Sequence, residues 1–247
     1  EVSLYHLTRA NENSLFVHPF NGERATFKLL NASKVHGYYG QEPRVESLTM
    51  FRNQMYRRIE EDVRDWMAEK RFMPRFLSGA GVFLLTYLLL TLVIRDPIPM
   101  VDELIGALLA GIGTYVAMGK RDLRSEDASK RRIALRSKID AAVFSQNSFV
   151  QELERSLKRY DDAEGEELLR KFQAVRAEPL WAEHGSDATR FLETLEIFLD
   201  NKKVKQLVRR VQKGGSGKGV LEFSRKSGLD LPLVLIYLEL KQELASV

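Results

Sequence analysis

The stretch FLSGAGVFLLTYLLLTLVI, residues Phe76–Ile94, decides the fold, because its nineteen residues include no charge. A helix rises about 1.5 Å per residue, so about 20 apolar residues cross a hydrocarbon layer of about 30 Å. The stretch therefore predicts a membrane-spanning helix. The alternative is a helix buried in a soluble core, but uncharged runs of this length are more typical of spanning helices.

A second apolar run, LIGALLAGIGTYVAM, covers residues Leu104–Met118. As a helix it reaches only about 22 Å, and an extension backwards through residues 97–101 lengthens it. The connection Arg95–Pro99 is short, so we expect the two helices to be antiparallel neighbours. The alternative is a second segment that re-enters the membrane or lies at its surface.

Basic residues lie before and after the two apolar runs but are nearly absent from the connection between them. The connection between the runs holds a single one, Arg95, whereas fifteen lie outside: Arg52, Arg57, Arg58, Arg64, Lys70, Arg71 and Arg75 before, and Lys120, Arg121, Arg124, Lys130, Arg131, Arg132, Arg136 and Lys138 after. Basic residues are enriched in cytoplasmic loops. This pattern predicts a two-pass protein of the inner (cytoplasmic) membrane with both termini cytoplasmic, or facing the matrix in a mitochondrion.

Small residues recur around the second run. They form a candidate packing surface, because small side chains let helix backbones approach closely in lipid: Gly106, Ala107, Ala110, Gly111, Gly113 and Thr114. One interpretation is that this surface packs only on the first run, through Gly79 and Gly81. The prediction we prefer is contact with another membrane subunit or a second copy, because the small residues surround more of the helix than one neighbour needs.

Three acids lie near the start of the second run: Asp96, Asp102 and Glu103. Carboxylates are favoured in the first turn of a helix, where backbone N–H groups lack partners. That interpretation is preferred. The alternative is an acidic ring at the outer mouth of an oligomeric pore, which would select cations.

The whole chain predicts an α+β membrane protein. Residues 1–44 form a small cytosolic β domain, 45–73 an amphipathic helix, 74–119 the hairpin, 120–212 an all-helical cytosolic domain, 213–219 a flexible linker and 220–247 terminal helices. Residues rich in β-branched and aromatic side chains predict four strands, with Asn21-Gly22 as a hairpin turn: Val2–Leu7, Ser14–Phe20, Ala25–Leu30 and Lys34–Tyr39.

The apolar stripe of the helix from Val45 to Phe72 predicts packing on the small sheet or on the helix after the hairpin. The alternative is a position on the membrane surface, with Trp66 at headgroup level. Later helices are expected at about 126–160, 163–176, 187–211, 220–226 and 232–244. Asp230 is expected to cap the last of these, which favours helix over strand for the apolar stretch Leu231–Leu240.

The residues show no catalytic or cofactor signature. There are no cysteines, and His6, His18, His36 and His184 lack the spacing of metal ligands. The sequence around Gly215–Lys218 departs from a Walker loop at Gln212 and Gly219. We therefore expect no cofactor and no bound metal, and we interpret the glycines as a joint.

Function follows only by exclusion. The expected role is a non-enzymatic accessory or scaffold subunit that docks to a larger membrane complex. One alternative is a homo-oligomeric cation channel, and another is a membrane-anchored enzyme without a recognisable motif. The expected partners are the lipid bilayer and other membrane subunits or further copies. Nucleic acid is not expected, because the basic residues crowd beside the apolar runs.

Overall fold

The computed structural model describes residues 1–247 except 21–26, 28–29, 31–32, 94–100, 164, 174–180, 214–216 and 246–247. The chain is mostly helical, with a small sheet and two apolar helices that are long enough to span a membrane. It divides into two compact units. The first, here called the head, comprises residues 1–53 and 138–247, and the second, the hairpin unit, comprises residues 54–137.

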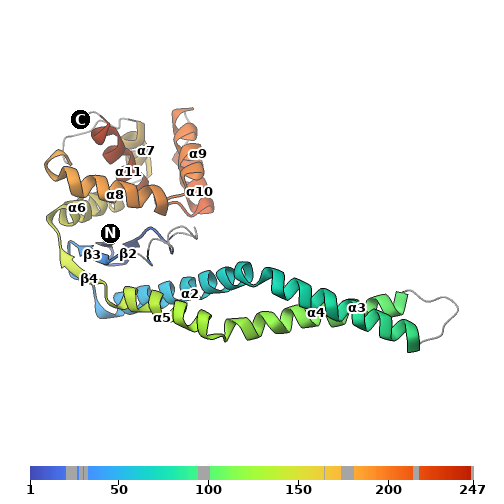
Figure 1. The fold of residues 1–247 in the computed structure, drawn as a ribbon. Helices are drawn as coiled ribbons and strands as arrows, with labels where there is room; N and C mark the ends of the chain where they lie inside the picture. The colour runs from blue at the N-terminus through green and yellow to red at the C-terminus, as the bar shows by residue number, and fades with distance from the viewer. Residues whose placement is uncertain are drawn as a thin grey trace. The chain divides into compact units, whose positions relative to one another are not determined.

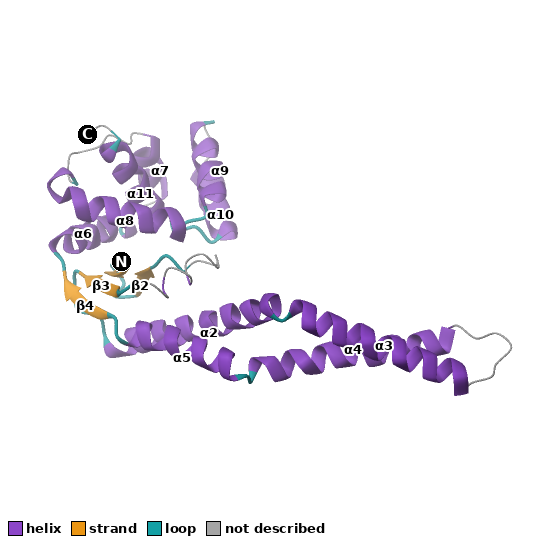
Figure 2. Ribbon diagram, viewed as in Figure 1, coloured by secondary structure: helices purple, strands orange, loops and turns teal. Residues whose placement is uncertain are grey.

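The sheet of the head, orange in Figure 2, has four strands in the order β2-β1-β3-β4 according to their hydrogen bonds. They are β1 (Val2–Thr8), β2 (Ser14–Val17), β3 (Val35–Tyr39) and β4 (Val143–Gln146). Strand β1 is antiparallel to β2 and parallel to β3, and β3 is parallel to β4. The hairpin unit is thus an insertion between two neighbouring strands of one sheet.

Strand β4 corrects the expectation that the chain is all helical after the apolar runs. The predicted helix at 126–160 is α5 (Glu126–Asp140), then β4, then α6 (Ser148–Asp161). Asn147 caps α6 by accepting a hydrogen bond from the Val150 N–H at 3.3 Å. Phe144 packs on β3 where Gly37 leaves space, since a Cβ there would overlap the Phe144 ring. The partner strand lies far earlier in the chain, so local spacing did not reveal it.

The predicted turn Asn21-Gly22 and most of the predicted strand Ala25–Leu30 lie outside the described residues. Two residues of that strand are described, Phe27 and Leu30, and both are helical and buried. The strand prediction is wrong at these positions. Their spacing of three places both side chains on one face of a helix, which is the pattern they follow.

The remaining helices of the head are α7 (Gly165–Gln173), the short η1 (Ala182–His184), α8 (Gly185–Phe198), α9 (Asn201–Gln212), α10 (Gly217–Ser227) and α11 (Leu231–Leu244). The predicted helix at 187–211 is two helices. Leu199 is extended, and Asp200 caps α9 by accepting from the N–H groups of Lys202 and Lys203. An Asp N-cap starts a new helix because its carboxylate satisfies the first free N–H groups.

The predicted cap of the last helix is confirmed, because Asp230 accepts from the Leu233 N–H at 3.2 Å. Helix α11 is apolar on nearly all sides because it is central: Leu233, Val234, Leu235 and Ile236 are all fully buried. A helix surrounded by protein needs no polar face.

One core joins the first strands to the last helices. Tyr5 of β1 packs edge-on against Phe191 of α8 at 4.8 Å between ring centroids, and Phe149 of α6 packs against both Phe191 and Trp181. Leu7 belongs to the same buried cluster. The small sheet therefore does not stand alone, as a sheet of this size cannot bury enough apolar surface by itself.

Helix α2 (Val45–Lys70) begins in the head. Phe51 stacks on Phe16 of β2 at 4.6 Å, and the Ser14 hydroxyl donates to the Ser47 hydroxyl at 2.9 Å. Packing of the amphipathic helix on the sheet is confirmed for this first part.

Candidate functional site

The hairpin unit is built from antiparallel helices. Figure 1 shows α3 (Phe72–Val93) beside α4 (Val101–Leu123). Arg75 pairs with Asp122, and Leu90 lies beside Gly106, so early residues of α3 meet late residues of α4. The expected antiparallel arrangement is confirmed. The connection 95–99, with Asp96, lies outside the described residues.

Large apolar side chains cover the outside of both helices. At least half of each of these residues is exposed: Leu84, Leu85, Leu88, Leu89, Leu92, Ile105, Leu108, Leu109 and Ile112. A core helix of a soluble protein buries such residues, and soluble monomers rarely expose continuous apolar patches of this kind. Both helices are long and apolar enough to cross a membrane. This surface is the candidate functional site.

The seam between the two helices uses part of the predicted small-residue surface. Ala107 and Gly111 are buried in α4. A Cβ on Gly111 would lie 2.9 Å from the Gly79 carbonyl oxygen and 3.1 Å from the Phe83 Cβ, and a Cβ on Gly106 would lie 3.2 Å from Leu90. The absence of side chains at Gly79 and Gly111 is what lets the backbones meet.

Other members of the predicted surface face outward. Gly113 is exposed, and a Cβ there would meet nothing within 4 Å. Ala117, one helical turn later, is also exposed. Ala110 and Thr114 are half-buried, and the Thr114 hydroxyl donates to the Ala110 carbonyl at 2.8 Å. The small residues thus divide between an inner seam and an outer strip.

A largely buried ion pair joins the first turns of α3 to the last turn of α4. Arg75 Nε lies 2.6 Å from Asp122 Oδ2, and the two side chains are 7% and 19% exposed. Gly119 lies beside the guanidinium, where a Cβ would come within 3.4 Å of Arg75 Nη1. From its position in the sequence, Arg75 is predicted only to be one of the basic residues that flank the first apolar run. An antiparallel arrangement places the start of the first run beside the end of the second, and this could have predicted the pairing of Arg75 with Asp122.

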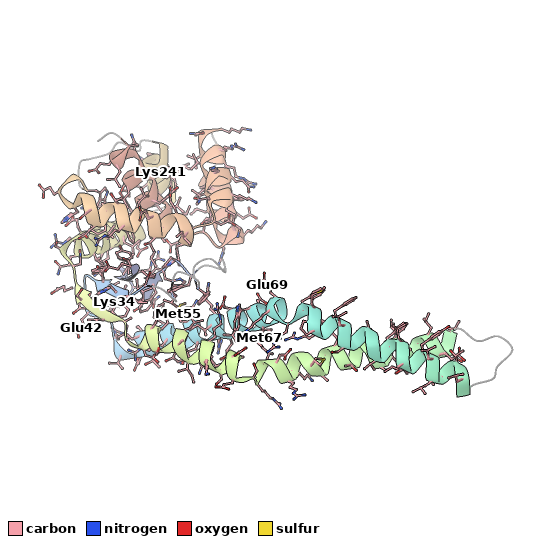
Figure 3. All side chains as sticks on the ribbon, viewed as in Figure 1. Lys34, Glu42, Met55, Met67, Glu69 and Lys241 are labelled. Carbon is pink, nitrogen blue, oxygen red and sulfur yellow. The ribbon has the colours of Figure 1, made fainter. Side chains whose placement is uncertain are left out.

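Beyond this pair, α2 continues alongside α5. Asp62 accepts from Arg131 at 2.8 Å, and Glu60 accepts from Arg132 and Arg136 at 2.7 Å each. Met55 and Met67, labelled in Figure 3, belong to the buried face of α2. Packing of α2 on the helix after the hairpin is confirmed. Several of the flanking basic residues are therefore occupied by acids of the same chain.

Trp66 of α2 lies between two cations in the same region. The Lys70 Nζ and the Arg131 guanidinium are each 4.8 Å from its ring. Cations stack on the indole face because the ring quadrupole is negative there. Trp66 is thus engaged within the hairpin unit.

The two described acids of α4 face different sides of the helix. Asp102 is exposed, whereas Glu103 is 3% exposed and lies on the face of Ala107 and Gly111. Neither Glu103 oxygen has a hydrogen-bond partner among the described residues. Both acids lie in the first turn of α4, as expected for the start of a helix. Only Asp102 is open to solvent or to a partner.

The histidines are dispersed through the head. His6 Nε2 lies 2.9 Å from the Ser14 hydroxyl, and His18 packs among aromatic rings that include Phe51 and Phe198. His36 lies 3.6 Å from Glu1, and His184 packs on Phe149. In the described part of the chain, no three His, Cys, Asp or Glu residues are grouped so that they could hold a metal ion.

Acid should destabilise the head through His6. Burial lowers the pKa of His6 to about 4, with a smaller opposing contribution from the backbone of Gln41. An unfolded histidine has a pKa of about 6.5, so the unfolded state binds the extra proton between pH 6.5 and 4. The free energy of unfolding should therefore fall by about 2 kcal/mol between pH 7.5 and 5 through this residue.

Urea unfolding followed by the fluorescence of buried Trp181, in a Trp66→Phe background, measures this loss. The loss should shrink in His6→Gln and persist in His36→Gln, because the His36 side chain is 43% exposed. An equal acid response in both variants would assign the effect to other groups.

The structure describes only part of the glycine-rich stretch. Residues 214–216 lie outside the described residues, and Gly217 and Lys218 already belong to α10. Comparison of the chain with protein-family models, with curated protein sequences and with solved structures gives no match.

Proposed function

We propose that this chain is a two-pass inner-membrane protein that serves as a non-enzymatic accessory or scaffold subunit. Helices α3 and α4 cross the bilayer, and the head lies on the cytoplasmic side. The observation that supports this most is the exposed leucine and isoleucine surface on both helices. In lipid such a surface is stabilising, whereas in water it would favour aggregation.

The charges of the hairpin unit support the same orientation. The buried pair Arg75–Asp122 marks the end of the apolar surface, and the ion pairs of α2 with α5 follow beyond it. Helices α2 and α5 carry these charges, and the proposal places both helices on the cytoplasmic side, where charged residues are tolerated and basic residues are enriched.

The topology of the sheet suits a scaffold. The hairpin unit leaves the head after β3 and returns at β4, and these strands are hydrogen-bonded neighbours. The chain therefore leaves and re-enters the head at two neighbouring strands of one sheet. Such a head is held to its anchor by two chain segments and not by a single linker.

The outer strip of α4 is the surface we propose for docking to another membrane subunit or a second copy. Gly113 and Ala117 are exposed one turn apart, and a Cβ on Gly113 would meet nothing. Packing between helices in lipid relies on such small residues because water is not there to drive association.

The proposed topology predicts one-sided labelling. The chain has no cysteine, so single cysteines report without background. In intact cells, cysteines at the exposed positions Asn11 and Gln206 should be protected from an impermeant thiol reagent, because the head is cytoplasmic. A cysteine at Pro97, between the spans, should react. Labelling of the head from outside would overturn the topology.

Native purification followed by mass measurement tests the subunit role. We expect the chain to co-purify with unlike membrane subunits, and Gly113→Leu should reduce that association because it fills the outer strip. Ile112→Leu is the matched control, since it keeps a large side chain at a neighbouring exposed position. A closed ring of identical copies would favour the channel alternative, and a lone chain would exclude a subunit role.

A further inference from the structure

Helices α9 and α10 concentrate positive charge. Residues 201–227 contain a single acid, Glu222, although the whole chain has a net charge of only +4. The basic residues of this segment, here called the basic face, are Lys202, Lys203, Lys205, Arg209, Arg210, Lys213, Lys218, Arg225 and Lys226. The concentration lies about 80 residues beyond the second apolar run, so it is separate from the basic residues that flank the two runs.

The cations of α9 point away from the core. Val204, Leu207 and Val211 are buried, and the exposed positions of this helix hold only polar and charged side chains. Among the described residues, no ion pair joins Lys205 or Arg209 to an acid. The basic residues of α5 differ, because acids of α2 bind them. The charges of Lys205 and Arg209 are therefore available to an external anion.

An open groove of about 470 Å³ runs along α9 in the head. Lys205 and Arg209 line it from α9, and Tyr237 and Lys241 line it from α11. Lys241, labelled in Figure 3, already donates to Glu196 at 3.2 Å and to the Tyr237 hydroxyl at 3.0 Å. The groove thus offers two uncompensated cations beside an apolar wall.

We propose that the basic face docks on anionic phospholipid headgroups, with phosphate groups at Lys205 and Arg209. This inference rests on the proposed membrane anchoring, which keeps the head near a bilayer whose cytoplasmic leaflet is negatively charged. The exposed side of α9 has no apolar side chain to insert. Binding is therefore electrostatic and peripheral, and salt weakens it.

The basic face fits single-stranded nucleic acid, the alternative anion, less well than it fits phospholipid headgroups. Such binding combines cations with exposed aromatic rings on which bases stack. Two aromatic rings lie beside the basic face, and neither is free for stacking. The Arg210 guanidinium covers Phe223 at 4.3 Å, and Tyr237 is 4% exposed with Lys241 over its ring. The exposed residues of α9 include no aromatic side chain.

The test uses the full chain held in zwitterionic nanodiscs and mixed with added vesicles. Vesicles of phosphatidylcholine alone are compared with vesicles containing about 30% phosphatidylserine, and bound protein is separated by flotation. The variant Lys202→Gln/Lys205→Gln/Arg209→Gln removes three cations from the basic face. The matched control Arg155→Gln/Lys158→Gln/Arg159→Gln removes the same charge from α6.

We expect binding only to the anionic vesicles, and loss of that binding at high salt. Each cation near an anionic surface strengthens binding about fivefold, so the α9 variant should bind roughly 100-fold more weakly. The α6 variant should bind like the parent. Equal weakening in both variants, or equal binding to both vesicle types, would overturn the proposal. Displacement of the protein from vesicles by single-stranded RNA at physiological salt would reassign the basic face to nucleic acid.

If the chain does not cross the membrane, the experiment gives a result that differs from failure of the basic face to bind lipid. A chain that does not span a bilayer will not enter nanodiscs and is released from membranes by alkaline carbonate. The vesicle assay is then run on protein held in amphipol. The same variants there test whether the basic face binds anionic lipid.

Discussion

Replacing Gly111 by leucine should open the helix pair, whereas the same replacement at Gly113 should leave it closed. The two glycines are two residues apart, which places them on opposite sides of α4. A Cβ on Gly111 would meet the Gly79 carbonyl oxygen at 2.9 Å, and backbone cannot move aside as a flexible side chain can. A Cβ on Gly113 would meet nothing. Both variants gain equal hydrophobicity, so insertion into the membrane should be retained in both.

A disulfide across the seam measures this difference. A Cβ on Gly79 would lie 3.6 Å from the Tyr115 Cβ, which is within the span of a disulfide. The pair Gly79→Cys/Tyr115→Cys should therefore oxidise readily in the otherwise cysteine-free chain. Cross-linking should fall at least tenfold with Gly111→Leu and stay unchanged with Gly113→Leu. Equal yields in the two variants would show that the Gly79–Gly111 contact does not hold the seam.

Removing one partner of the buried pair Arg75–Asp122 should cost about 3–5 kcal/mol of unfolding free energy. In Arg75→Met, the Asp122 carboxylate loses its guanidinium while it stays largely enclosed, with a side chain only 19% exposed. Most of the cost is the desolvated charge that remains. Replacing both partners, as in Arg75→Met/Asp122→Leu, removes that charge and should restore stability to within about 1 kcal/mol of the parent.

Unfolding of the parent, Arg75→Met, Asp122→Leu and the double variant in detergent micelles completes a double-mutant cycle for this pair. The control is the surface pair Lys130–Glu126, whose side chains are both more than 70% exposed. Lys130→Gln should cost less than about 0.5 kcal/mol, because water screens that pair. A double variant as unstable as Arg75→Met would mean that the two residues act separately.

The helix pair, α2 and α11 were predictable from the sequence because their signals are local. A long uncharged run, an apolar stripe at helical spacing and the Asp230 cap each depend on residues close together in the chain. Transfer of apolar side chains out of water also depends little on their exact neighbours. The same reasoning identified α4 as rich in small residues, including Gly111 and Gly113.

Which side of α4 packs inward was decided only by the tertiary structure. Gly111 and Gly113 are alike in sequence, and they differ only because α3 lies against one of them. The pairing of Arg75 with Asp122 likewise depends on how the two helices are aligned. Neither choice leaves a periodic signal, because the partner is set by close packing between distant segments.

The head shows the same limit more strongly. Strand β4 is predicted as helix because Val143 follows Ile139 at a helical spacing, and only pairing with β3 makes residues 143–146 a strand. Leu199 ends α8 where the predicted helix continued, because Asp200 starts a new helix that packs in another direction. The sequence by itself determined the two apolar helices and the helical nature of most of the chain. The tertiary structure decided which strands pair and which faces meet, because those contacts join residues that are far apart in the chain.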